Sequence, residues 1–509
     1  MRRFVAFLAA LALCVVVVGC GGGHDDKTVT PLDDALGYFS KDAPFVASVE
    51  TDPDGQQIKE ISQLVGRFPG ADILRQRLQG LTRFPFVRSD DVRSQLGAPL
   101  VVGLLRPAAG SELSTPLIVA MRMKHPLRAK QFLLRQPGFR GSGKSSGVRI
   151  YENPNENRYA AVDGDAVVAA TDRGILEQAL AMKRSDNRMR ESTFKRDLAK
   201  LPSGGLVQVS ADPRALIGAD ARLRPALSVK WIASLRRLGA VLKASSTGIT
   251  LDFRAATDKS AISDGDLPLA PKAGDLPLIG KRGEVEVGLR EPSRLARLAF
   301  QIAHAIAPRR MALLKALEPR GIDLERQLPH HLNDAGVVAW DPVTHAVAAR
   351  ADLNEAGDVK SALTQLTPAL PAVGALFGIK GLGVATPEAG ENFYALARPN
   401  TMGASGAGGT GGRTVIFGVV GNSLVAATDA SRAAALASAA THTAPGGAKG
   451  AAVVSVNARE LAGKLLAKEL QGAAGLFAPL AVASLRDFTG VLAISREALR
   501  GHFKLTIVK

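Results

Sequence analysis

Residues 138–145 read Gly-Phe-Arg-Gly-Ser-Gly-Lys-Ser and match the phosphate-binding loop pattern G-x-x-x-x-G-K-[ST] at every fixed position. Such a loop follows a buried strand and opens a helix, because backbone N–H groups and the helix N-terminus must converge on phosphate. Here the order is reversed, since residues 126–136 predict a helix before the motif and residues 148–151 a strand after it. We therefore interpret residues 138–145 as a surface loop, and we expect no cofactor.

The same stretch contains a second chemical pattern. Gly143-Lys-Ser-Ser-Gly147 fits the G-x-S-x-G nucleophile elbow of hydrolases. That elbow also requires a strand, a turn and a helix in this order, so the reversed context argues against it too. A hydrolase or nucleotide-binding enzyme remains an alternative, and it would require residues 138–147 to lie between a strand and a helix.

Histidines and paired carboxylates give no defined site. His330, His331 and His345 form the only histidine grouping, and adjacent side chains on regular structure point apart, so we expect no shared metal. The doublets Asp33-Asp34 and Asp90-Asp91 lie near predicted helix starts, where the helix dipole favours negative charge, and we interpret them as caps. We therefore predict a non-catalytic protein with no catalytic, cofactor-binding or metal-binding residues.

The composition is that of a globular chain. The chain has 509 residues, of which 46% are apolar and 22% charged, and this length favours two or three domains at roughly 100–200 residues each. Two cysteines exclude a disulfide framework and a Cys-rich zinc module. With two Trp and four Tyr, the chain has few rings on which a glycan-binding groove could stack sugars.

The N-terminus has the pattern of a secretory signal. Arg2 and Arg3 precede an apolar run from Phe4 to Val18, whose 15 residues are fewer than the ~20 that a membrane-spanning helix needs. The run ends in Val17-Val18-Gly19-Cys20, which resembles the bacterial lipobox, in which the cysteine is acylated and becomes the mature N-terminus. An ordinary signal peptide or an uncleaved anchor is the alternative.

A lipid on Cys20 would place the protein at the membrane. We predict a signal peptide over residues 1–19, a tether over residues 20–34 and a lipid anchor on Cys20, with the folded part on the extracytoplasmic face of the cell membrane. Two acyl chains are sufficient for stable anchoring. The mature chain would then retain no free thiol.

The remaining chain contains sequence blocks that occur twice in the same order. The paired blocks are GDAVVAATD at 164–172 with GNSLVAATD at 421–429, VQVSAD at 207–212 with VSVNAR at 454–459, and ASLR at 233–236 with ASLR at 483–486. Because order and spacing are kept, we predict a tandem duplication. The predicted units are a first repeat at 35–257, a connector at 258–274 and a second repeat at 275–509.

Within one repeat, short runs rich in Val, Ile and Tyr predict strands. These runs lie at 99–105, 116–123, 148–151, 159–162 and 166–171. Residues 172–184 predict a helix with Asp172 as its N-cap, and Asp163-Gly164 and Gly421-Asn422 predict hairpin turns. We therefore expect an α+β fold of two tandem homologous domains, each a mainly antiparallel sheet with helices packed on one face.

Charge is the most informative surface property. The net charge is +17, and no acidic residue lies between Glu112 and Glu152. The basic residues of this interval are Arg122, Lys124, Arg128, Lys130, Arg135, Arg140, Lys144 and Arg149. They are candidates for contact with anionic lipid or an acidic wall polymer, and a solvated helix face is the alternative. We expect no nucleic acid, since only Phe132 and Phe139 interleave these cations.

Several features together suggest a family. After the lipobox come Asp33-Asp34-Ala35-Leu36 and a predicted strand behind Ala43-Pro44. In these features the chain resembles uncharacterised lipoproteins of actinobacterial type that form a domain-of-unknown-function family, and the resemblance implies no catalytic residues. We expect a lipid-anchored binding or scaffolding protein of the cell envelope with an unidentified partner protein. The alternative is a carrier that holds a lipid or other apolar ligand between sheet and helices.

Overall fold

A computed structural model describes most of the chain after the N-terminal segment. The described residues are 30–68, 98–105, 117–123, 130–131, 133–134, 138–279, 284–315, 318, 323–369, 383–385, 393–397, 415–443, 449–469 and 482–508. Within these ranges no helix is both long enough and apolar enough to cross a membrane.

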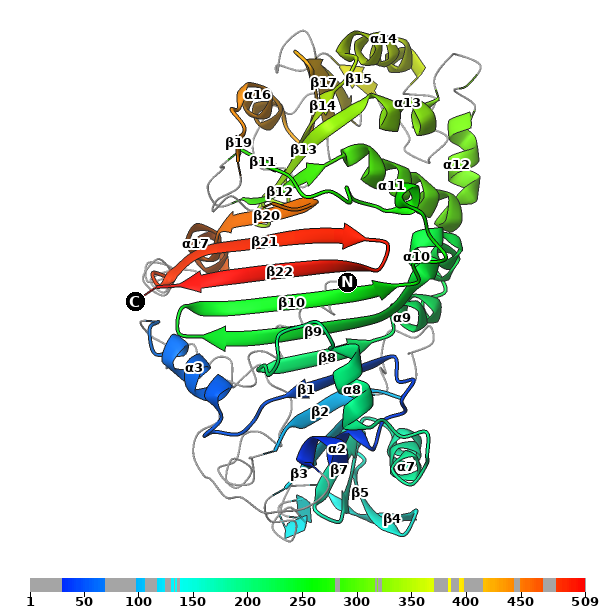
Figure 1. Ribbon diagram of the computed structural model, residues 1–509, viewed down its shortest axis with the longest axis vertical. Helices are drawn as coiled ribbons and strands as arrows, with labels where there is room; N and C mark the ends of the chain where they lie inside the picture. The colour runs from blue at the N-terminus through cyan, green and yellow to red at the C-terminus, as the bar shows by residue number, and fades with distance from the viewer. Residues whose placement is uncertain are drawn as a thin grey trace.

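One antiparallel sheet of twenty strands extends along the whole molecule (Figure 1). From one edge to the middle the strands are β4 (Arg140–Ser145), β5 (Val148–Asn153), β6 (Arg158–Asp163), β7 (Ala166–Ala170), β3 (Leu117–Arg122), β2 (Leu100–Leu104), β1 (Phe45–Val49), β8 (Val207–Ala211), β9 (Leu235–Ser245) and β10 (Gly248–Thr257).

The sheet then continues directly into the second half of the chain, because β10 pairs with the last strand, β22. From the middle to the other edge the strands are β22 (Ala498–Ile507), β21 (Leu485–Ser495), β20 (Ala452–Asn457), β12 (Val285–Arg290), β13 (Leu332–Trp340), β14 (Val347–Leu353), β18 (Ser423–Ala427), β17 (Val415–Val420), β16 (Phe393–Ala397) and β15 (Gly383–Ala385).

The strand order is the same in both directions from the β10–β22 junction. The repeated sequence blocks fall on matching strands: the block at 164–172 contains β7 and the block at 421–429 contains β18, while β8 and β20 hold the next pair of blocks. The expected α+β class and antiparallel sheet are confirmed. The two predicted units share a single sheet, and their boundaries as separate domains stay a prediction.

Helices pack on both faces of the sheet. The helices of the described residues are α2 (Pro31–Leu36), α3 (Gln56–Val65), α7 (Arg173–Met182), α8 (Glu191–Asp197), α9 (Pro213–Ala219), α10 (Lys230–Ser234), α11 (Pro292–Ile306), α12 (Pro308–Leu314), α13 (Leu324–His331), α14 (Ala356–Leu366), α16 (Ala430–Ser438) and α17 (Ala458–Glu469). In β1, Val46 packs in the core that holds Leu36 of α2 and Phe194 of α8, whereas its neighbour Ala47 packs in the core of α3. The expectation of helices on one face only is therefore wrong, because successive strand residues point to opposite faces and both sides of β1 are apolar.

Several local expectations are confirmed. The Asp172 side chain accepts a hydrogen bond from the Ile175 N–H and caps α7, as Asp429 caps α16 by accepting from the Arg432 N–H. The turns between β6 and β7 and between β17 and β18 contain Gly164 with φ +61° and Gly421 with φ +56°. These positive φ values are the reason that glycine stands at both positions.

The connector between the halves is packed against the sheet. Ile262, Leu267 and Leu269 lie in one core with Ala452 of β20, while Leu276 and Leu278 lie in another core with the next residue, Val453. Since Ala452 and Val453 point to opposite faces, the connector contacts one side of the sheet, and Leu276 and Leu278, which follow the connector, contact the other side. A short second sheet pairs β11 (Pro277–Leu278) with β19 (His442–Thr443).

Candidate functional site

The four strands at the middle of the sheet have one apolar face. Strand register places alternate residues of β9, β10, β22 and β21 on the same side, and every one of these positions is Ala, Gly, Ile, Leu or Phe. We call the partly exposed larger side chains of this face the apolar central surface, whereas Ile494 and Ile507 on the same face are buried. Its members are Leu238, Leu242, Ile249, Leu251, Phe253, Phe488, Leu492, Leu499, Phe503 and Leu505.

Three aromatic rings form a ladder across this surface. The ring centroids of Phe488 and Phe503 lie 5.8 Å apart and those of Phe503 and Phe253 lie 6.0 Å apart, with an interplanar angle of 16° in each pair. A Cβ added at Gly490 would lie 2.0 Å from the Phe503 ring, and one added at Gly501 would lie 2.2 Å from the Phe253 ring. The rings therefore lie close against the sheet, over glycines that leave room for them.

The apolar central surface is not fully buried. Its most exposed member is Leu251, at 37% exposed. At one end the surface meets the core of α3, against which Leu242 and Leu505 pack, and at the other end Leu492 and Leu499 pack against the core formed by the connector. The middle part, which includes Leu251, presents carbon atoms to solvent.

The opposite face of β10 and β22 is polar in its middle part. There His502 Nδ1 of β22 lies 2.7 Å from Asp252 Oδ1 of β10, and Arg254 stands opposite Arg500 in the register. Thr250 is likewise opposite Lys504. The two strands β10 and β22 therefore have one apolar and one polar face, as alternation with a period of two in the sequence predicts.

The basic residues predicted from the sequence are only partly brought together. Arg122 pairs with Asp165 at 3.4 Å, and Arg140 pairs with Glu152 at 3.3 Å. Lys144 and Arg149 are exposed and stand opposite each other in the β4–β5 hairpin. Lys130 is an exposed helical residue, and Lys124, Arg128 and Arg135 lie outside the described residues.

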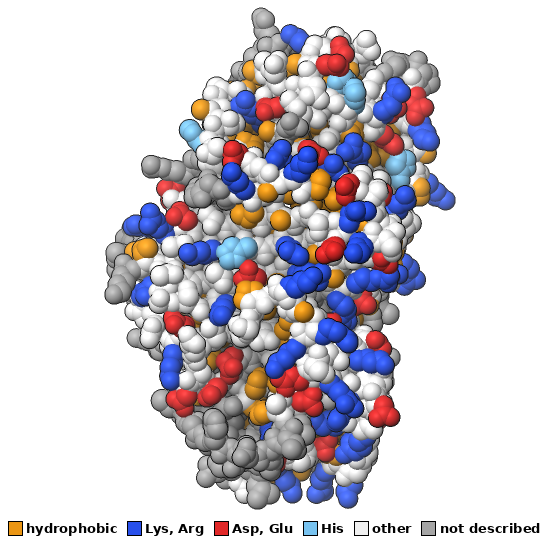
Figure 2. Space-filling view, in the orientation of Figure 1, with side chains coloured by type: hydrophobic (Ala, Val, Ile, Leu, Met, Phe, Trp, Pro, Cys, Tyr) orange, Lys and Arg blue, Asp and Glu red, His pale blue; other side chains and the backbone are white. Residues whose placement is uncertain are grey.

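Figure 2 shows that Lys and Arg also gather on the right side of the drawn face, over α8, α9 and α10. Exposed cations in this region are Lys195, Arg214, Arg222, Arg224 and Lys230. No continuous basic run in the sequence marks these residues as a group, because they are contributed by separate short elements.

The phosphate-loop motif lies in a hairpin. Residues 140–145 form β4, Ser146 and Gly147 form the turn with φ of +48° and +79°, and β5 follows at Val148. Both positive φ values fit a type I′ hairpin turn. The expected loop is therefore a strand, and residues 138–147 do not join a strand to a helix as either enzyme motif requires. Sequence reasoning missed β4 because Gly and charged residues have low strand propensity.

The carboxylate doublet Asp33-Asp34 lies in the first turn of α2, but the cap of this helix is Thr30, whose hydroxyl accepts from the Asp33 N–H. Asp33 Oδ1 accepts a hydrogen bond from the Glu191 N–H, and Asp34 pairs with Lys183. The two acids thus join α2 to its neighbours, and the expectation of a cap is wrong for this pair. Asp90 and Asp91 lie outside the described residues.

The histidine grouping is divided between two places. His330 and His331 end α13 with ring centroids 5.2 Å apart, and His345 lies in the turn after β13 with φ +59°. Glu355 and Asp358 at the start of α14 approach His331, so that one ligand atom of each of the three lies within 4.8 Å of the others. Sequence reasoning missed this group because the two acids are more than twenty positions away.

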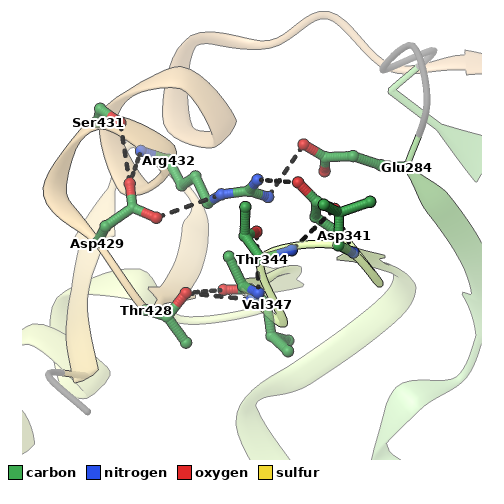
Figure 3. A network of polar contacts seen from close by, with 10 residues as sticks. Glu284, Asp341, Thr344, Val347, Thr428, Asp429, Ser431 and Arg432 are labelled. Carbon is green, nitrogen blue, oxygen red and sulfur yellow. Dashed lines mark hydrogen bonds and ion pairs between the residues drawn. The ribbon is translucent and has the colours of Figure 1, made fainter. Parts of the chain in front are cut away.

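A buried ionic cluster lies at the start of α16 (Figure 3). The Arg432 guanidinium is 2.9 Å from Glu284 Oε1, 3.3 Å from Asp341 Oδ2 and 3.2 Å from Asp429 Oδ2. The side chains of Arg432, Glu284 and Asp341 are 15%, 9% and 9% exposed. Through these ion pairs, Arg432 of α16 contacts the residue before β12 and the residue after β13.

The electrostatics of this cluster suit a structural role. Burial alone would raise the pKa of Asp341, but hydrogen bonds from the Val343 N–H and from Thr344 outweigh it and hold that pKa below its usual value. A lowered pKa is the opposite of what a general acid needs at neutral pH. In the first half, Ile175 takes the helix position of Arg432 and is buried, so the same attachment of a helix to the sheet is made there by apolar packing.

A sequence signal for the apolar central surface did exist. The segments Ile249-Thr-Leu-Asp-Phe253 and Leu499-Arg-Gly-His-Phe503 alternate apolar and polar residues with few exceptions. Such alternation predicts strands with one apolar face. What it does not predict is that four such strands meet in the middle of one sheet.

Comparison with known proteins gives a family and a distant likeness. A family model described as a protein of unknown function (DUF3352) matches residues 4–271, which is more than half of the chain. No curated protein matches the chain. Crystal form I of TP0453 matches with 12% identity and a TM-score of 0.27 over 49% of this chain and 88% of that chain, and crystal form III with 9% and 0.27 over 45% and 82%. Because the match to the family model covers more than half of the chain, the protein belongs to the DUF3352 family of proteins of unknown function.

Proposed function

We propose that this protein is a non-catalytic, lipid-anchored binding protein on the extracytoplasmic side of a bacterial cell envelope, and that it binds acyl chains through the apolar central surface. The observation that carries the proposal is the partly exposed ladder of Phe488, Phe503 and Phe253 with Leu251 beside it. The support for the anchor is the lipobox ending at Cys20, which lies outside the described residues.

The chemistry of the surface favours an acyl chain over other ligands. A peptide or a sugar needs hydrogen-bond partners when it leaves water, since unpaired polar groups are costly to bury. The side chains of the apolar central surface contain no donor or acceptor, and the backbone groups beneath them are used in strand pairing. An acyl chain needs no such partner and gains about 25 cal/mol for each Å² of apolar surface buried. Exposed apolar patches of this kind mark interaction sites.

Anionic headgroups or an acidic wall polymer would complement the basic residues. Lys144 and Arg149 are the best candidates for contact with an anionic group, because they are exposed and adjacent at one edge of the sheet. Arg122 and Arg140 already have carboxylate partners. An actinobacterial-type origin and an envelope partner protein belong to the same proposal and rest on the sequence resemblance.

The binding proposal is tested by native mass spectrometry of residues 31–509, followed by solvent extraction and titration with a fluorescent fatty acid. We expect a stoichiometric acyl adduct on the wild-type protein, loss of binding in Leu251→Glu, and unchanged binding in Thr250→Glu. Thr250 is the matched control because it adjoins Leu251 on the same strand and points to the polar face. If the wild-type protein carries no adduct and does not bind the probe, or if both variants bind as it does, the proposal fails.

The anchor is tested separately by metabolic labelling with an alkyne fatty acid in a bacterial host. We expect the full chain to be labelled and to sediment with membranes, and Cys20→Ser to be unlabelled. The Cys14→Ser variant is the control, because Cys14 lies within the predicted signal peptide. Equal labelling of the Cys20→Ser variant would exclude this residue as the lipid carrier.

A further inference from the structure

We propose that His331, Glu355 and Asp358 bind a divalent transition-metal ion. The three residues each offer one ligand atom, and these atoms lie within 4.8 Å of one another. His331 is the last residue of α13, and the two carboxylates come from the start of α14, with Glu355 at the N-cap position. This inference is independent of the proposed lipid binding, because the residues lie outside the four central strands.

The imidazole has a nitrogen available for a ligand. The His331 side chain is 14% exposed, while its Nδ1 atom is fully buried and has no hydrogen-bond partner. Glu355 Oε2 lies 3.6 Å from that nitrogen, which is too far for a hydrogen bond. Buried polar atoms in proteins are almost always partnered, so a ring nitrogen that has no partner and belongs to a histidine beside two carboxylates requires an explanation. A bound cation supplies one.

The backbone holds the ligand-bearing segments together. The Asn354 N–H donates to the His331 carbonyl at 3.0 Å, and the Asn354 side-chain amide donates to the His330 carbonyl at 3.4 Å. One step further into the sheet, Leu332 pairs with Leu353. The positions of His331 and Glu355 are therefore fixed relative to each other by main-chain contacts, as a binding site of defined geometry needs.

In the part of the chain that the structure describes, the two carboxylates form neither a helix cap nor an ion pair with Lys or Arg. Glu355 makes no side-chain capping bond to α14, and neither acid has a Lys or Arg partner among the described ion pairs. Two carboxylates this close repel each other, and a cation between them removes the repulsion. The C-terminal end of α13, where His331 lies, also favours positive charge.

The donor set selects the class of metal. One imidazole and two carboxylates suit zinc or manganese, whereas Mg²⁺ and Ca²⁺ prefer oxygen ligands alone. Zinc binds histidine nitrogen and carboxylate oxygen at about 2.0–2.2 Å, so its ligands are roughly 3.4 Å apart in a tetrahedron. The ligand atoms lie within 4.8 Å of one another, and rotation of the exposed Glu355 and Asp358 side chains would bring them to the shorter zinc spacing without moving the backbone.

The test is titration of residues 31–509 with Zn²⁺ by calorimetry and with Co²⁺ by visible absorption. We expect one ion per chain, a Co²⁺ spectrum with ligand-field bands, and an apparent Kd that rises about tenfold or more in Glu355→Gln and in Asp358→Asn. Mg²⁺ at the same concentration should not displace Zn²⁺ or Co²⁺ from the site. Both variants change exposed side chains, so we expect them to keep the wild-type melting temperature without metal.

Two neighbouring histidines provide controls. His330→Gln changes the ring next to His331, and His304→Gln changes a histidine whose Nε2 already has a partner, Glu325 Oε2, at 2.7 Å. Both should bind Zn²⁺ as the wild-type protein does. Absence of binding by the wild-type protein overturns the proposal, and so does equal binding by Glu355→Gln and Asp358→Asn. The former result would mean that the three side chains lie close together without a bound cation.

Discussion

His502 and Asp252 face each other at the centre of the junction between the two halves of the chain, with Nδ1 2.7 Å from Oδ1. Each is the fifth residue of the last strand of its half, since β10 begins at Gly248 and β22 at Ala498. The register is symmetric about this pair, with Thr250 opposite Lys504 on one side and Arg254 opposite Arg500 on the other. The halves therefore meet as two equivalent edges related by an approximate two-fold axis.

The contact between Asp252 and His502 should contribute little to stability. The His502 side chain is 57% exposed, and exposed ion pairs are typically worth about 0.2–1 kcal/mol. We expect a double-mutant cycle of Asp252→Asn and His502→Gln, measured by urea unfolding, to give a coupling free energy within that range. High salt should reduce it, since salt screens exposed charges. A much larger or salt-independent coupling would show that the pair is effectively buried.

The glycines under the ring ladder should contribute more to stability than the contact between Asp252 and His502 on the other face. Gly501→Val and Gly490→Val would place methyl groups where the rings of Phe253 and Phe503 lie. Overpacking of this kind costs about 1–3 kcal/mol, and we expect each variant to lose free energy of unfolding in that range. Ala493→Val on the exposed polar face of β21 is the control, and it should stay within about 0.5 kcal/mol of wild type. Equal effects of all three substitutions would mean that the rings are not constrained by the sheet.

Much of the first half could be predicted from sequence because its signals are local. The runs at 99–105, 116–123 and 166–171 became β2, β3 and β7 with shifts of one residue, and Asp172 caps its helix as expected. Each of these features depends on residues within about one turn of helix or one strand. The pairing of β10 with β22 joins residues 250 positions apart, and no local pattern specifies it.

The candidate site was harder to predict for the same reason. The alternation in Leu499-Arg-Gly-His-Phe503 indicates one apolar face, but a sheet usually buries such a face under helices. That this face stays partly exposed depends on where α3 and the connector end. The strand β4 was missed because it forms from Gly, Ser and charged residues and is specified by pairing with β5 rather than by its own propensity.

Loss of the Arg432 side chain should be among the more damaging single changes. The Arg432→Met substitution would leave Glu284 and Asp341, both 9% exposed, without their cation. Removal of one partner from a buried charge cluster costs about 3–5 kcal/mol, so we expect a loss of that order in the free energy of unfolding. Arg486→Met is the control, because Arg486 is 69% exposed beside Asp487. It should change stability by less than about 0.5 kcal/mol. If the two variants are equally stable, the cluster contributes nothing beyond a surface pair.

Stability should fall in acid as Asp258 becomes protonated. The Ser260 hydroxyl and the Arg236 guanidinium hydrogen-bond the carboxylate of Asp258 and lower its pKa from 3.8 to about 2 in the folded protein. A carboxyl whose pKa is lower in the folded state stabilises it above the unfolded pKa, and this contribution is lost as the pH falls through the folded pKa. We therefore expect unfolding midpoints to decrease between pH 4 and about pH 2.

The Asp258→Asn variant isolates this contribution, because an amide does not titrate. Its midpoint should be lower than that of wild type at neutral pH and should depend less on pH in the acid range. Ser260→Ala, which removes the largest cause of the pKa shift, should move the acid limb of the wild-type profile to higher pH. Asp341 also has a lowered pKa, so some acid dependence should persist in both variants. An Asp258→Asn profile that parallels wild type from neutral pH to pH 2 would assign the acid dependence to other carboxylates.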